Sequence, residues 1–248
     1  MGAGLLALTG CAALPPPAPP RPIPQEARRL ITSLERRWVQ FADLRAVAEI
    51  TIRKGSESQR LTGVLLLLAP ASVRFEALTP WGQPFLFLVS TAERFTLYHV
   101  AENRALVGPP SAEATERWLG FALGPEELVG ILSGHVLPLK DPQSAEILEA
   151  DALGPSLKLT GSGGEQRIWL DPEALTPLQV EFAGGRAAAR ISFAGNGVAT
   201  PPSSMTLTAL DQPLTISIRY RDASLGTGLS ADLFHLVLPK HTKIQRFR

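Results

Sequence analysis

Short stretches with a period of two dominate this sequence from residue 44 onward. In the first of them Leu44, Ala46 and Ala48 alternate with polar neighbours, which is the pattern of a strand with one buried face. Glycine pairs at 163–164 and 184–185 separate later stretches and favour hairpin turns. No regular succession of strand, helix and strand occurs, so the pattern favours an antiparallel sheet over a parallel one. We therefore expect a mainly β (α+β) protein whose sheet curls into a barrel or half barrel closed by a few helices.

The strands and helices can be placed along the chain from these periods. The expected strands are 44–53, 59–68, 73–78, 85–90, 94–100, 105–108, 147–150, 157–160, 166–170, 178–182, 188–193, 204–209 and 215–221. Helical spacing predicts helices over 25–41, 111–119 and 125–132, which would cover the concave face. The arginine-rich face of the first helix is expected to be solvated, with contact to anionic headgroups as the alternative. A small barrel would be filled by side chains, whereas an open one would leave a cavity.

The N-terminus carries Leu8-Thr9-Gly10-Cys11, and Cys11 is the only cysteine. This motif resembles the lipobox of bacterial lipoproteins, in which the cysteine is acylated. Residues 1–10 would then be a signal-peptide remnant, and because they contain no Lys or Arg we expect the true start to lie upstream. Residues 11–24 hold the lipidated cysteine and a proline-rich tether. Residues 25–248 would form the folded domain. Ala12, in place of an aspartate, favours the outer membrane by the same resemblance.

The composition excludes several classes of function. The formal net charge is +1 with both signs interspersed, which predicts no nucleic-acid partner. No apolar run after Cys11 approaches the roughly 20 residues of a transmembrane helix. The four histidines have no zinc-binding spacing, and Ser133-Gly134-His135 lacks the esterase elbow. We therefore expect no metal, no cofactor and no catalytic residue. A hydrolase would require a cleft in which titratable side chains converge.

Two motifs and the C-terminal segment indicate a family. The motifs are Leu44-Arg45-Ala46-Val47-Ala48-Glu49-Ile50 and Val73-Arg74-Phe75-Glu76-Ala77-Leu78-Thr79-Pro80-Trp81-Gly82. Near the C-terminus, residues 234–239 and the basic segment that follows resemble the closing strand of this family. In this layout the chain resembles the LolA/LolB-like envelope proteins, especially the LolB-like outer-membrane lipoproteins. The resemblance implies a curved antiparallel half barrel over most of residues 25–248. It also implies a hydrophobic cavity that takes the acyl chains of lipoproteins.

The resemblance further singles out Trp81. LolB-like proteins project an exposed leucine from the loop between the third and fourth strands, and here Pro80-Trp81-Gly82 occupies that position. Tryptophan keeps a large apolar tip and favours the membrane interface. Trp81 would therefore contact membrane or cargo, or it would fold back over the mouth of the barrel.

The remaining expectations concern the cavity and the partners. The side chains expected to line the cavity are Trp38, Phe75, Phe85, Phe87, Trp118 and Phe121. The expected partners are acyl chains of lipoproteins or phospholipids, the membrane through lipid on Cys11, and a periplasmic carrier protein. The chain would be a monomer on the periplasmic side of the outer membrane. The alternative is a lipid-tethered scaffold without a ligand cavity, which binds another protein through a sheet edge or an exposed loop.

Overall fold

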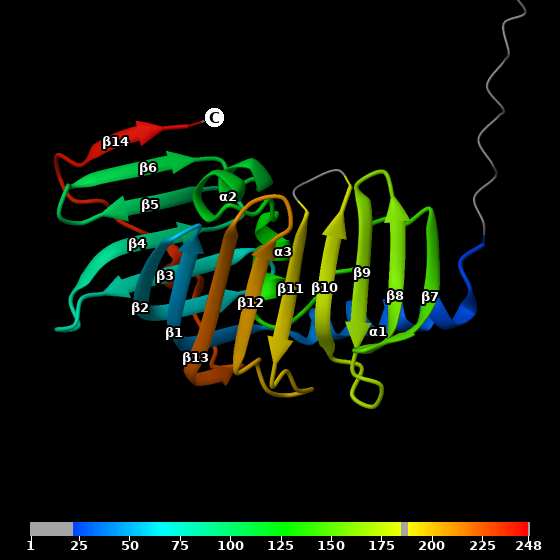
Figure 1. The fold of residues 1–248 in the computed structure, drawn as a ribbon. Helices are drawn as coiled ribbons and strands as arrows, with labels where there is room; N and C mark the ends of the chain where they lie inside the picture. Colours follow the sequence, from blue (N-terminus) through cyan, green and yellow to red (C-terminus); the bar gives the residue numbers. More distant parts are fainter. Residues whose placement is uncertain (1–21, 185–187, 248) are drawn as a thin grey trace, which may run out of the picture.

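One curved sheet of 14 strands organises the computed structural model, which describes residues 22–184 and 188–247 (Figure 1). The strands are β1 Asp43–Lys54, β2 Glu57–Leu68, β3 Ser72–Leu78, β4 Pro84–Ser90, β5 Phe95–His99, β6 Arg104–Gly108, β7 Ser144–Asp151, β8 Gly154–Gly161, β9 Gly164–Leu170, β10 Pro177–Ala183, β11 Ala189–Ala194, β12 Ser204–Ala209, β13 Leu214–Leu225 and β14 Lys243–Arg246. Their order across the sheet is β14-β6-β5-β4-β3-β2-β1-β13-β12-β11-β10-β9-β8-β7. All pairs are antiparallel except β14 with β6. The expected mainly β half barrel is confirmed.

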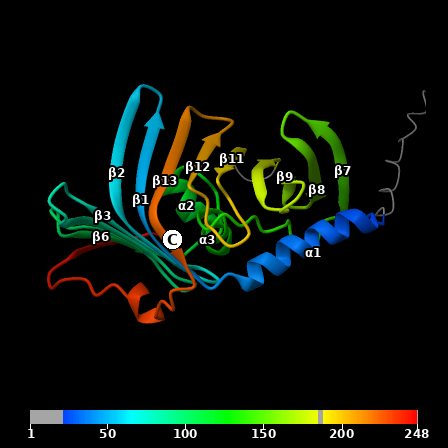
Figure 2. The ribbon, with the colours of Figure 1, turned by 90° about the horizontal axis from the view of Figure 1, so that it is seen from below.

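The helices occupy few residues: α1 Gln25–Gln40, α2 Ala112–Leu119, α3 Pro125–Leu132 and the 3-10 turn η1 Ala231–Phe234. Helix α3 begins with Pro125 at its first position, where the missing N–H costs nothing. Helix α1 lies beside the β7 end of the sheet, with Ala27 and Leu34 buried (Figure 2). Within the described residues, no helix combines the length and the apolar composition needed to cross a membrane.

The core lies on the concave face of the sheet, where α2 and α3 sit (Figure 2). Strand pairing places Ala46, Leu65, Phe75 and Leu88 in one row across β1 to β4 on this face. The Tyr220 hydroxyl donates a 2.7 Å hydrogen bond to the Leu132 carbonyl, which ties α3 to β13. The alternation of the sequence thus decides which side chains meet the helices.

The expected closing strand over 234–239 is wrong. The chain after β13 instead crosses the convex face of the sheet, and we call residues 226–247 the C-terminal strap. Phe234 is buried there against Leu66 and Val89. The last strand is β14, which follows Pro239 and pairs with β6. The resemblance predicts a strand over 234–239, but residues 235–239 form no strand, and Phe234 packs against the sheet through its side chain.

Asp43 fastens the start of the strap. Its carboxylate is 2% exposed and accepts hydrogen bonds from the Thr227 backbone and hydroxyl and from the Gly228 and Leu229 amides, at 2.8–3.4 Å. Burial alone would raise the pKa of Asp43, but these donors together hold it below its ordinary value. The carboxylate is therefore charged and fully bonded at neutral pH.

Candidate functional site

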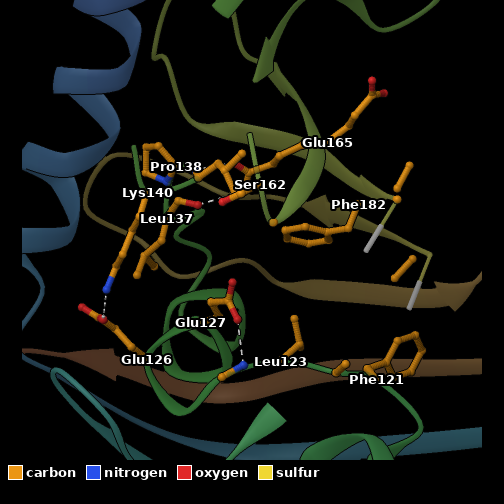
Figure 3. Close-up of a pocket in the computed structure, with 18 of the residues that line it drawn as sticks. Phe121, Leu123, Glu126, Glu127, Leu137, Pro138, Lys140, Ser162, Glu165 and Phe182 are labelled. Atoms are coloured by element: carbon orange, nitrogen blue, oxygen red, sulfur yellow. Dashed lines mark hydrogen bonds and ion pairs between the residues drawn. The ribbon is translucent and has the colours of Figure 1, made fainter. Parts of the chain in front are cut away.

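A cleft of about 420 Å³ opens at one end of the concave face (Figure 3). Its walls come from the start of α3, the segment 137–140, and the strands β9, β10 and β11. The interior is mainly apolar and is lined by Phe121, Leu123, Leu137, Leu139, Phe182 and Ala189. Its volume falls within the roughly 300–1,000 Å³ of small-molecule pockets. An apolar chain fits this lining.

Buried Gln166 holds one wall of the cleft in place. Its side-chain oxygen accepts from the Leu139 amide at 2.7 Å, and its side-chain nitrogen donates to the Leu137 carbonyl at 2.8 Å. The segment 137–140 is not a strand, so Gln166 supplies the backbone partners that a neighbouring strand would give. The two leucines are thereby fixed along the cleft. Sequence reasoning missed this residue, because a single glutamine in a strand carries no signal of such a role.

The charges on the rim of the cleft are paired with each other. Glu126 accepts the Trp38 indole N–H at 3.1 Å and lies 3.5 Å from Lys140 Nζ. Lys158 pairs with Glu165 at 3.1 Å. Because the rim charges already have partners, they do not single out a charged ligand, and the apolar interior dominates what the cleft can bind.

Four of the predicted cavity residues contact the concave core. Phe121 is 1% exposed and lies at the floor of the cleft. Phe75 is buried among the core residues, and Phe85 packs against the same cluster. Trp38 also contacts this cluster but stands outside the cleft, where its ring stacks on Phe41 with 5.6 Å between centroids. Only Phe121 of these four lines the cleft itself.

Phe87 lies on the convex face, which contradicts its expected place in the cavity. It pairs with Glu76 and stacks on Tyr98, and the Arg74 guanidinium lies 5.7 Å from its ring centroid. A β-bulge opposite Ala77 and Leu78 leaves Phe85 without a partner on β3. Phe85 and Phe87, two residues apart, therefore face opposite sides of the sheet.

The other predicted site residues lie elsewhere. Trp81 is 86% exposed in the turn between β3 and β4, so its ring does not fold back over the concave face. Trp118 belongs to α2, and its side chain lies outside the described part of the structure. Cys11 and most of the proline-rich tether precede residue 22 and also lie outside it.

Ser133 is buried, and His135 beside it is partly buried. Ser133 Oγ lies 3.0 Å from His135 Nδ1, but Ser133 is 2% exposed and its hydroxyl donates to the Val129 carbonyl at 2.8 Å. Among the described residues, no group of three or more His, Cys, Asp or Glu could hold a metal ion. The arrangement offers packing rather than a nucleophile open to substrate.

The buried imidazole predicts a pH-dependent stability. Burial, aided by the charge of Arg37, lowers the pKa of His135 from 6.5 to about 4. Between these values the unfolded chain binds the extra proton, so stability falls as the pH is lowered. We expect the free energy of unfolding to drop by about 2 kcal/mol from pH 8 to pH 5. Urea titrations should show this drop, and His135→Phe should lose it; an unchanged pH dependence in the variant would contradict the assignment.

Solved structures with the same architecture were found by comparison. A domain from Vibrio parahaemolyticus described as an outer membrane lipoprotein-sorting protein has a TM-score of 0.60 at 18% identity, covering 84% of this chain and 97% of its own. A LolA superfamily protein from Nitrosomonas europaea has a TM-score of 0.52 at 10% identity, covering 85% and 97%. The chain has the LolA/LolB-like fold. A DUF1329 family protein from Desulfovibrio piger shares this fold, with a TM-score of 0.58 at 13% identity, covering 85% and 96%.

The comparisons that rest on sequence gave no match for this chain. No protein-family model matches it, and no curated protein matches it either. The structural likeness therefore concerns the fold, and the function has to be argued from the cleft.

Proposed function

We propose that this protein binds acyl chains of lipoproteins or phospholipids in the cleft and acts as a lipid-anchored protein of the outer membrane. The observation that carries the proposal is the apolar interior of the 420 Å³ cleft behind a rim of paired charges. Burying ten methylenes would contribute about 8 kcal/mol before the costs of ordering the ligand. Binding by burial requires no catalytic residue. The lipoprotein-sorting description of the Vibrio protein supports the same class of ligand.

The floor of the cleft explains how a longer chain could be accommodated. Phe121, Leu123 and Ala189 belong both to the cleft lining and to the buried core on the concave face. An acyl chain longer than the cleft would reach this core when α3 and the segment 137–140 move outward. In this proposal the exposed Trp81 turn contacts membrane or cargo during transfer.

A fluorescent fatty acid tests the proposal directly. We expect saturable binding at one site, with a net affinity weaker than the roughly 8 kcal/mol of burial because ordering the ligand opposes binding. An excess of unlabelled palmitate should displace the probe. No saturable binding, or binding that palmitate does not reduce, would contradict an acyl-chain cleft.

The anchor is a separate part of the proposal and has its own test. In cells grown with radioactive palmitate, we expect label on the full chain. Cys11→Ala should remove the label, because Cys11 is the only cysteine and the proposed acylation site. Equal labelling of wild type and Cys11→Ala would contradict lipidation at this residue.

A scaffold function is favoured by one observation, the open ends of the sheet. Strands β7 and β14 each have a neighbour on one side only within the described chain. Their outer edges present backbone N–H and C=O groups to which a strand of another protein, such as a periplasmic carrier, could pair. This alternative predicts a stable protein complex and no bound lipid.

A further inference from the structure

The C-terminal strap presents a basic and apolar surface that the cleft does not use. From residue 233 to 248 the sequence contains no Asp or Glu, whereas it contains Lys240, Lys243 and Arg246. The same stretch exposes Leu233 by 41%, Val237 by 78% and Ile244 by 51%. Apolar side chains that face water between basic ones are typical of segments that bind a membrane surface.

Side-chain packing, hydrogen bonds and strand pairing fix the strap on the sheet, and these side chains therefore face the solvent. Phe234 packs inward against the convex face, while Val237 three residues later points away from it. Asn103 fixes the next turn, since its amide donates to the His241 carbonyl at 3.3 Å and its oxygen accepts from the Thr242 hydroxyl at 2.8 Å. Strand β14 then pairs with β6. The exposed surface belongs to an anchored segment and not to a loose tail.

The basic side chains of the strap are available for a partner. No carboxylate of the described residues forms an ion pair with Lys240, Lys243 or Arg246. Carboxylates lie beside the strap, among them Glu93 near 234–236, Glu102, which is paired with Arg104, and Glu113 and Glu116 near Phe247, but none of them is within ion-pair distance of the three basic residues. The surface therefore keeps its positive charge, which complements a negative one.

The strand directions bring the turn of the strap to the same end of the sheet as Trp81. The β3–β4 turn and the β5–β6 turn lie at this end, and β14 starts there because Lys243 pairs with Arg104 (Figures 1 and 2). The exposed tryptophan and the basic turn at 239–243 could thus meet one flat surface together. Figure 2 also shows the strap on the outer side of the sheet, away from α2 and α3.

We propose that the C-terminal strap docks on a bilayer surface that contains anionic phospholipids. Lys240 and Arg246 lie at the headgroups, and Val237 and Ile244 enter the interfacial region beside them; Ile244 and Arg246 share one face of β14, because alternate residues of a strand point the same way. This contact requires neither the acyl anchor at Cys11 nor an occupied cleft. It orients the β3–β4 end of the sheet toward the membrane.

Vesicle sedimentation tests the proposal with the full chain carrying Cys11→Ala, so that no acyl group contributes. One vesicle set is phosphatidylcholine alone, and the other is an equimolar mixture with phosphatidylglycerol. We expect binding to the mixed vesicles that is at least about tenfold tighter than to phosphatidylcholine and that weakens with added salt. Equal binding to both vesicle sets, or none to either, would overturn the proposal.

Charge reversal locates the contact. Lys240→Glu with Arg246→Glu should reduce binding to the mixed vesicles by about tenfold or more, because each basic side chain near an anionic surface contributes. The matched control is Lys54→Glu with Arg60→Glu on the β1–β2 hairpin, whose side chains are equally exposed and lie outside the strap. The control should bind like the parent protein. Equal losses in both double variants would overturn the placement on the strap, whatever the fatty-acid titration shows.

Discussion

Replacing Phe182 by aspartate is expected to weaken binding of the fluorescent fatty acid by about tenfold to a hundredfold. Phe182 is half-buried on β10 and lines the cleft. The substitution removes apolar contact worth about 1.5–3 kcal/mol and places a carboxylate beside the acyl chain. Since each 1.4 kcal/mol changes the dissociation constant tenfold, even the loss of contact alone reaches this range. Probe titration of wild type and variant at equal protein concentration measures the change.

Phe87→Asp is the matched control for this prediction. Phe87 is also a half-buried phenylalanine in a strand, but it lies on the convex face beside Arg74 and Tyr98. Its substitution should leave the affinity for the probe within about twofold of wild type, because no residue of the cleft touches it. Similar losses in both variants would mean that the probe reports general stability and not the cleft.

Asp43→Ala is expected to lower the free energy of unfolding by about 3 kcal/mol, the largest stability effect among these variants. The carboxylate is buried and accepts from three backbone amides of the strap and one hydroxyl. Alanine would remove the buried carboxylate that accepts from the Thr227 and Gly228 amides. The contribution of Asp43 is present above its ordinary pKa of 3.8 and is lost as the pH falls through the lower folded value. Urea unfolding at pH 7 measures the difference.

Asp151→Ala separates burial from the number of hydrogen bonds. Asp151 accepts from Leu153, Trp169 and Arg167, so it has as many partner residues as Asp43, but its side chain is 41% exposed. Water can replace its bonds, and we expect a clearly smaller loss of stability. If Asp151→Ala destabilised the protein as much as Asp43→Ala, burial of the carboxylate would not explain the larger effect expected for Asp43.

The regular elements could be predicted from the sequence because alternation and helical spacing are local signals. Helix α3 begins at Pro125 and ends at Leu132 as expected, and β12 spans Ser204–Ala209 as expected. Other strands, such as β13, extend several residues beyond the predicted limits. Pairing with a neighbour carries a strand past the point where its alternation weakens, and the sequence of one strand does not contain that information.

The site was harder to predict, because it depends on register and on distant contacts. Phe85 and Phe87 should share a face by alternation, and only the bulge opposite Ala77 and Leu78 separates them. Gln166 shapes the cleft through the distant segment 137–140. Among the predicted lining residues whose side chains the structure describes, Phe121 alone borders the cleft, whereas Phe182 was absent from the prediction. The sequence identifies aromatic residues on apolar faces. Which of these side chains line the cleft depends on the tertiary fold.

Lipid retained by the purified protein is the most direct test of acyl-chain binding. The full chain with Cys11→Ala would be purified from bacterial cells without detergent, extracted with organic solvent, and the extract quantified by mass spectrometry. We predict acyl lipid at close to one equivalent per protein, and a loss of most of it when Phe182→Asp is added. A lipid-free extract of the Cys11→Ala protein, if that protein also fails to take up added palmitate, would contradict the proposed function.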